Sequence, residues 1–188
     1  MGSLFVIESI AAEETLRESA TAEDLAFVEQ FGSLSRRCEV LAWRGVVRRE
    51  LGCDVEISHD EYGAPIINKP NIYISVSHSR DRVAVLFADG VCAVDIESAE
   101  RDFGRVATRY LSSEEQQLAE QHDLYAELWC AKEALYKYYK KGGLDFAKDI
   151  SVETFDIDRG VLQCSILGGE TIDVKIKRED NLVIAVID

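Results

Sequence analysis

The sequence predicts an α+β fold made of two similar halves with antiparallel sheets. Twice along the chain, apolar residues at helical spacing are followed by runs that alternate as strands do, and no Pro- or Ser-rich linker intervenes. With 188 residues, the chain is long enough for one domain or two fused half-domains. We therefore expect an N-terminal half over residues 1–92 and a C-terminal half over 93–188, joined in one compact unit.

In the first half, residues 33–52 predict a helix that ends at Gly52. The helix carries five arginines, so it predicts a local basic surface, with Arg48 and Arg49 on a solvated face. Strands are expected over 72–79, 82–87 and 91–97. The pair Asp89-Gly90 predicts a hairpin between the last two, because a type I′ turn needs positive φ at both central residues.

The second half begins with a helical pattern. Ser112 and Glu115 are spaced as a capping box, which predicts a helix starting at Ser113. A longer helix follows and ends at the pair Gly142-Gly143. Its expected buried stripe consists of Leu124, Leu128, Ala131, Leu135 and Tyr138. Four further strands, at 152–157, 161–167, 171–177 and 182–187, predict an antiparallel meander.

Charge and composition exclude several classes of function. The chain has 21 Lys and Arg against 35 Asp and Glu, and this net charge of −14 disfavours nucleic-acid binding. Five cysteines without a C-x-x-C pair indicate reduced thiols. No apolar run suggests a leader peptide or a membrane span. We expect a cytoplasmic protein with neither a membrane nor a nucleic acid as partner.

Two carboxylates in the middle of the chain suggest a cation site. Asp95 and Glu97 are two apart on a predicted strand, so both leave the same face and could bind one hard divalent ion, or could simply face solvent. Glu133 and Lys137 are at i,i+4 on the long helix, where they form either part of a site or an exposed ion pair. Strand alternation places His78 beside apolar neighbours, as a core histidine or as a phosphate donor.

Four stretches in this order resemble the motifs of the 4′-phosphopantetheinyl transferases. They are Asp-Glu-Tyr-Gly-Ala-Pro at 60–65, Ser-Val-Ser-His-Ser at 75–79, Ala-Val-Asp-Ile-Glu at 93–97 and Trp-Cys-Ala-Lys-Glu-Ala-Leu-Tyr-Lys at 129–137. The resemblance spans roughly residues 36–143. Since the Asp-x-Glu motif starts more than ninety residues in, the chain looks like the larger, surfactin-synthetase-activating type. That type implies a monomer whose halves are related by a pseudo-twofold axis, with the active site at their junction.

The resemblance implies an enzyme with holo-acyl-carrier-protein synthase activity. Such an enzyme moves 4′-phosphopantetheine from coenzyme A to a serine of an apo acyl, peptidyl or aryl carrier protein and releases 3′,5′-ADP. The choice between fatty acid biosynthesis and another pathway stays open. The resemblance implies magnesium bound by Asp95, Glu97 and Glu133. It further implies Glu133 as the base that activates the serine, directly or through metal-bound water, and Lys137 as the group that neutralises the pyrophosphate.

It also implies contacts to coenzyme A. Ser77, His78 and Lys132 would bind phosphate, Gly63 and Pro65 would form the loop against the adenine, and Arg37 would reach the 3′-phosphate. Two positions depart from the family pattern, because Ala93 replaces a glycine and Ala64 replaces a lysine. Two other functions are compatible with these residues: a non-catalytic module that binds coenzyme A or a carrier protein, and a magnesium-dependent nuclease.

Overall fold

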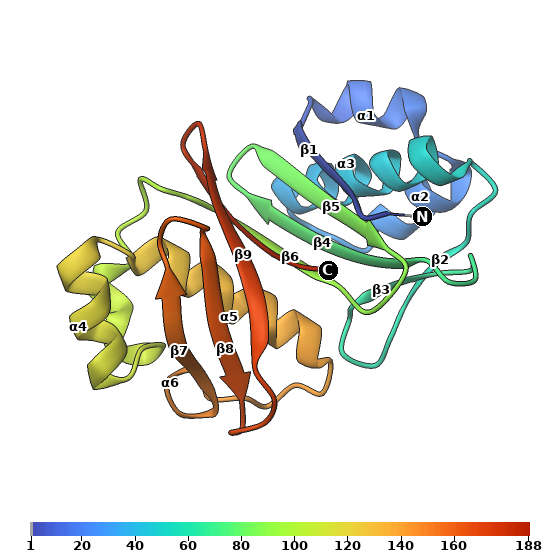
Figure 1. Cartoon of the computed structure of the whole chain (residues 1–188). Coiled ribbons are helices and arrows are strands. Elements are labelled where there is room, and N and C mark those ends of the chain that lie inside the picture. Colours follow the sequence, from blue (N-terminus) through green and yellow to red (C-terminus); the bar gives the residue numbers. More distant parts are fainter. Residues whose placement is uncertain (1) are drawn as a thin grey trace. The chain divides into compact units, whose positions relative to one another are not determined.

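The computed structural model describes residues 2–188 and confirms the α+β fold with antiparallel sheets (Figure 1). The chain forms two compact units, of which unit 1 ends at Gly90 and unit 2 begins at Val91. The similarity of the two halves and the pseudo-twofold axis stay predictions. No helix within residues 2–188 is both long and apolar enough to cross a lipid bilayer.

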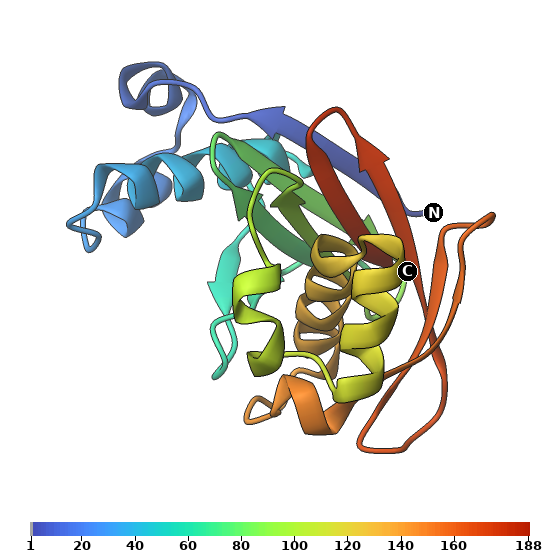
Figure 2. The ribbon, with the colours of Figure 1, turned by 90° about the vertical axis from the view of Figure 1, so that its left-hand side faces the viewer.

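Unit 1 places helices on one side of a three-stranded sheet (Figure 2). The strand order is β1-β5-β4, antiparallel throughout. Its strands are β1 (Leu4–Ser9), β4 (Tyr73–Ser79) and β5 (Arg82–Ala88), with a separate pair β2 (Ile57–His59) and β3 (Pro65–Ile67). Its helices are α1 (Glu13–Ser19), α2 (Ala22–Val28) and α3 (Leu34–Leu51). As predicted, α3 ends at Gly52, whose φ of 104° suits glycine.

The arginines of α3 do not form the expected basic surface. Arg44 and Arg48 are 1% and 5% exposed, and both bind the buried Asp24 of α2. The exposed Arg49 pairs with Glu8 and Glu50. The expectation of a solvated Arg48 was therefore wrong, because helical spacing shows which residues share a face but not what packs against it.

The hairpin predicted at Asp89-Gly90 is also wrong. Strand β5 pairs with β1 and β4, whereas β6 (Ala93–Ser98) pairs with β10 (Leu182–Ile187) of unit 2. The chain passes from one unit to the other at this point. Turn-forming residues suit a connection between sheets as well as a hairpin, so local sequence could not separate the two.

Unit 2 contains a five-stranded antiparallel sheet in the order β6-β10-β9-β8-β7. The remaining strands are β7 (Ile150–Asp156), β8 (Val161–Ile166) and β9 (Ile172–Glu179), and with β10 they form the predicted meander. The helical segments are η1 (Gly104–Arg109), α4 (Ser113–His122), α5 (Tyr125–Tyr139) and α6 (Phe146–Asp149). They lie on one side of the sheet (Figures 1 and 2). The predicted capping box of Ser112 and Glu115 is present at the start of α4.

Candidate active site

Unit 2 brings the candidate metal ligands together through the packing of α5 on β6. Side chains alternate along β6, so Asp95 and Glu97 leave one face while Val94 and Ile96 are fully buried on the other. Asp95 itself is only 6% exposed. Glu133 and Lys137 lie one turn apart on α5.

Two cations of the chain hold the strand carboxylates. The Nζ of Lys137 donates to Asp95 Oδ1 at 2.8 Å and to the carbonyl of Val94 at 2.9 Å. The guanidinium of Arg101 donates to Glu97 Oε1 at 2.7 Å. The carboxylates of β6 are thus partly neutralised by the protein's own side chains.

Glu133 is a carboxyl group in an environment that disfavours its charged form. Burial raises its pKa to about 7, the negative charges of Asp95 and Glu97 add to the rise, and Lys137 and Arg101 oppose it. The negative charges of Asp95 and Glu97 thus act electrostatically on Glu133. A carboxyl with a pKa near neutral pH has the affinity for protons that a general base needs.

The donor set suits a hard divalent cation, because three carboxylates supply the oxygen ligands that magnesium prefers. Their mutual repulsion at Glu133 would be relieved by a cation. Within residues 2–188, however, no three His, Cys, Asp or Glu side chains are arranged closely enough to hold a metal ion directly. Lys137 holds one oxygen of Asp95 and Arg101 one oxygen of Glu97, so a cation would compete with these side chains for the two carboxylates.

A pocket of about 650 Å³ opens beside Glu133. Aromatic side chains form part of its wall, where Trp129 of α5 packs against Tyr110 and Phe146, while charged side chains form another part. Arg101 lines the same pocket and lies over the rings of Phe103 and Trp129. The remaining lining residues are Val106, Arg109, Gly143, Leu144 and Asp145. This volume and lining are typical of a small-molecule site.

Lys132 does not lie where a phosphate contact requires. Its side chain is 0% exposed and its Nζ is bound to Glu115 Oε2 at 2.6 Å and to two backbone carbonyls. Burial lowers the pKa of Lys132, and Glu115 opposes that change. An ammonium group has three donors, and all three are engaged within the protein. The burial of Lys132 contradicts its expected role as a phosphate ligand.

In unit 1, the arginine beside His78 is Arg36 and not Arg37. Arg36 Nη1 lies 3.0 Å from His78 Nε2, and Glu39 approaches both side chains. Arg37 instead binds Glu13 and donates to the carbonyl of Phe31. Since His78 is 42% exposed, it is not a core histidine.

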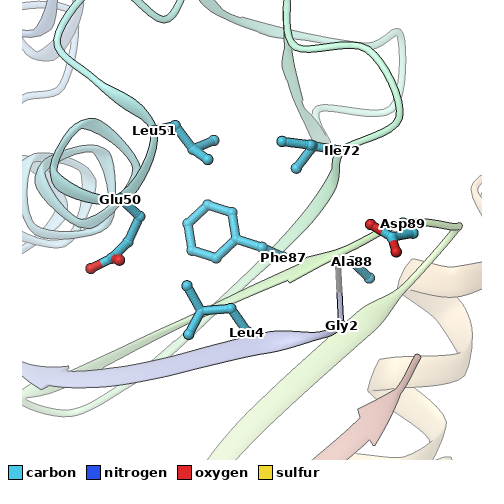
Figure 3. A pocket seen from close by; sticks show the side chains of 8 residues that line it. All are labelled: Gly2, Leu4, Glu50, Leu51, Ile72, Phe87, Ala88 and Asp89. Atoms are coloured by element: carbon cyan, nitrogen blue, oxygen red, sulfur yellow. The ribbon is translucent and has the colours of Figure 1, made fainter.

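The other candidate residues of unit 1 lie on or near β3 and β4. Ser77 is buried on β4, and Pro65 begins β3. Gly63 has a φ of 83° in the turn that Asp60 stabilises. A pocket of about 60 Å³ in this unit contains none of these residues (Figure 3). The ring of Phe87 lies there among Leu4, Leu51 and Ile72 (Figure 3).

Sequence reasoning missed Arg101 and most of the pocket. Arg101 follows Glu97 by four residues, but it lies beyond the end of β6, where sequence spacing does not predict which side chains are in contact. Tyr110 and Phe146 lie on different elements, 36 residues apart, and meet only because Trp129 packs between them. The signal that could have drawn attention to them was the density of aromatic residues between 103 and 146.

Comparison with protein families identifies the superfamily of the chain. The model of the 4′-phosphopantetheinyl transferase superfamily matches residues 91–187, just over half of the chain and nearly all of unit 2. The chain belongs to this superfamily, and its general activity is the transfer of phosphopantetheine. Comparison with curated proteins gives no match.

Proposed function

We propose that this protein transfers 4′-phosphopantetheine from coenzyme A to a serine hydroxyl of an apo carrier protein, with magnesium as cofactor. The observation that carries the proposal is the position of Glu133, a partly buried carboxyl on α5 whose charged form is disfavoured by burial and by the neighbouring carboxylates of β6. It lies within the region that matches the family and lines a pocket large enough for a substrate arm.

The proposed reaction uses Glu133 as general base. The serine oxygen attacks the phosphorus that carries the pantetheine, and the serine proton passes to Glu133. The bond from that phosphorus to the bridging oxygen breaks, and 3′,5′-ADP leaves. Lys137, which lies in the same cluster, would neutralise the charge that develops on the leaving oxygen.

Asp95, Glu97 and Glu133 would hold the magnesium ion. When bound, magnesium neutralises the diphosphate and makes the phosphorus more electrophilic. The pocket beside Glu133 would take the pantetheine arm, because Trp129, Phe146 and Leu144 offer apolar surface to its methylene groups. Arg101 and Arg109 give the same pocket polar groups for its amides.

Unit 1 would contribute contacts to the phosphates of coenzyme A. Arg36 donates to His78 Nε2 on a partly exposed surface, so we propose Arg36 in place of Arg37 for the 3′-phosphate. Ser77, Gly63 and Pro65 keep their expected roles as proposals. We also propose that the protein acts as a monomer and that it is cytoplasmic.

Intact-mass measurement tests the proposal. The protein is incubated with coenzyme A, magnesium and a panel of apo carrier proteins, and a phosphopantetheine-sized gain on a carrier is expected. Glu133→Gln should abolish the gain while coenzyme A still binds, whereas Glu120→Gln on the exposed surface of α4 should be fully active. Coenzyme A binding without transfer to any carrier would instead identify a non-catalytic module.

A further inference from the structure

Lys132 joins four elements of unit 2 at one buried point. Its Nζ donates to Glu115 Oε2 of α4 at 2.6 Å, to the carbonyl of Phe146 at 2.8 Å and to the carbonyl of Ile150 at 2.7 Å. The same glutamate accepts from the backbone N–H groups of Ser112 and Val152, each at 2.8 Å. Lys132 therefore links α5 to α4, α6 and the start of β7.

One of the two carbonyls bound by Lys132, that of Phe146, belongs to the segment that lines the pocket, and the other, that of Ile150, lies four residues further along the chain. After α5 the chain reverses direction through three residues of positive φ, Lys140, Gly142 and Gly143. It then runs back along the helix, where Gly143, Leu144, Asp145 and Phe146 line the pocket beside Glu133. The Phe146 ring packs against Trp129 and Tyr136 of α5.

Helix geometry makes Lys132 and Glu133 complementary. Adjacent residues on an α-helix point about 100° apart, so one can face the interior while the next faces the pocket. Lys132 is 0% exposed beneath the pocket segment, and Glu133 lines the pocket itself. Lys132 holds the carbonyl of Phe146, and the next residue along the helix, Glu133, lines the same pocket as Phe146.

We propose that Lys132, held by Glu115, is a positioning residue that anchors the segment 143–150, whose first four residues line the pocket beside Glu133. An ammonium group suits this place because its three donors meet three acceptors at one buried point, two of them backbone carbonyls. The role of the pocket in holding the pantetheine arm rests on the proposed function. The tether, by which we mean the hydrogen bonds from Lys132 to the carbonyls of Phe146 and Ile150, does not depend on that function.

Hydrogen exchange of the ligand-free protein tests the tether. The reporters are the amides of Ala147, Lys148 and Asp149, which are bonded to Asp145. Lys132→Met should speed their exchange by about tenfold, because two carbonyls of the segment lose their donor. Lys132→Met alone leaves the buried Glu115 carboxylate without its cation, and the double variant Lys132→Met with Glu115→Gln removes that charge. The double variant should show the same increase in exchange, because the two carbonyls still have no lysine donor.

Lys148→Met is the matched control. It removes a lysine from the same segment, but this side chain is 79% exposed and pairs only with Asp145 at the surface. Exchange at Ala147 and Asp149 should change by less than about twofold. Unchanged exchange in Lys132→Met, or an equal increase in Lys148→Met, would overturn the tether.

Ligand affinity separates positioning from direct phosphate contact. In the double variant, coenzyme A should bind about tenfold more weakly, whereas 3′,5′-ADP, which lacks the pantetheine arm, should bind within about twofold of the wild-type value. An equal loss for both ligands would contradict the positioning role. If the wild-type protein binds neither ligand, the proposed function fails, and the exchange measurement still decides the tether.

Discussion

Glu133 shows how a single residue can be costly to the fold and useful to the site. Its unfolded-state pKa is near 4.5 and its folded-state pKa is about 7, chiefly because of burial and secondly because of Asp95. Between these values, the unfolded chain releases the proton before the folded protein does. The free energy of unfolding therefore falls as the pH rises from about 4.5 to about 7.

Replacing Glu133 should therefore stabilise the protein at alkaline pH. With a chelator present, Glu133→Gln is expected to be more stable than the wild type at pH 8, by up to about 3 kcal/mol, and no more stable at pH 4. Urea titrations at the two pH values measure this. Glu120→Gln, on the exposed side of α4, should show no such dependence. A gain that is equal at both pH values would rule out ionisation of Glu133 as its cause.

Arg101 competes with the proposed metal for Glu97. Because its guanidinium holds Glu97 Oε1 at 2.7 Å, Arg101→Leu should increase the affinity for magnesium several-fold. Titration calorimetry with magnesium, or with manganese as a probe, measures the change without coenzyme A. Arg105→Leu is the control, since this arginine is 84% exposed and pairs with Asp102. Weaker metal binding in Arg101→Leu would show that the arginine supports the site.

At the scale of elements, unit 1 is held by a buried ionic contact between two helices. Asp24 of α2 accepts from both Arg44 and Arg48 of α3, and Arg48 also donates to the carbonyls of Cys53 and Val55. Burial alone would raise the pKa of Asp24, but hydrogen bonds from Arg48, Arg44 and Thr21 hold it well below its usual range. The network fixes α2 and the chain after α3 against the same helix.

Loss of the Asp24 charge should destabilise unit 1. Asp24→Asn leaves two buried arginines without their carboxylate, at an expected cost of about 3–5 kcal/mol at pH 7. The pKa of Asp24 is depressed, so the difference from the wild type should narrow as the pH falls below about 4. Denaturant unfolding measures both effects. The half-exposed Glu23, which contacts the same arginines, should cost no more than about 1 kcal/mol when changed to Gln.

Elements that depend on local signals were predictable from the sequence. The capping box at Ser112 and the end of α3 at Gly52 each follow from residues within a few positions. The spacing of Glu133 and Lys137 likewise follows from one helix. Lys132 was misjudged because its acceptors lie 14 to 18 residues away along the chain, and only packing brings them together. The same reason applies to Arg44, whose partner Asp24 precedes it by 20 residues.

At the scale of the whole molecule, the hydrophobic core is divided between the units. One cluster of buried side chains, including Val47 and Val85, draws only on residues before Gly90. The other, including Leu128, Leu135 and Val183, draws only on residues after Val91. Each unit therefore has apolar burial of its own to stabilise it.

A cavity in the hydrophobic core of one unit should lower the stability of that unit more than the stability of the other. Leu128→Ala removes a fully buried side chain and is expected to cost about 2–5 kcal/mol. Hydrogen exchange should then accelerate in β6 and β10 and change little in β4 and β5. Leu167→Ala, at a position that is 59% exposed, is the control. Equal acceleration in both units would mean that they unfold together.

The pairing of β6 with β10 determines when this part of the protein can fold during synthesis. Strand β10 lies between β6 and β9, and it is synthesised more than eighty residues after β6. Unit 1 can complete its sheet as soon as β5 emerges from the ribosome, because β1 and β4 precede it. The strand that carries Asp95 and Glu97 must wait for β10. A nascent chain therefore acquires its carboxylate cluster only after β10 has emerged from the ribosome, well after unit 1 can have folded.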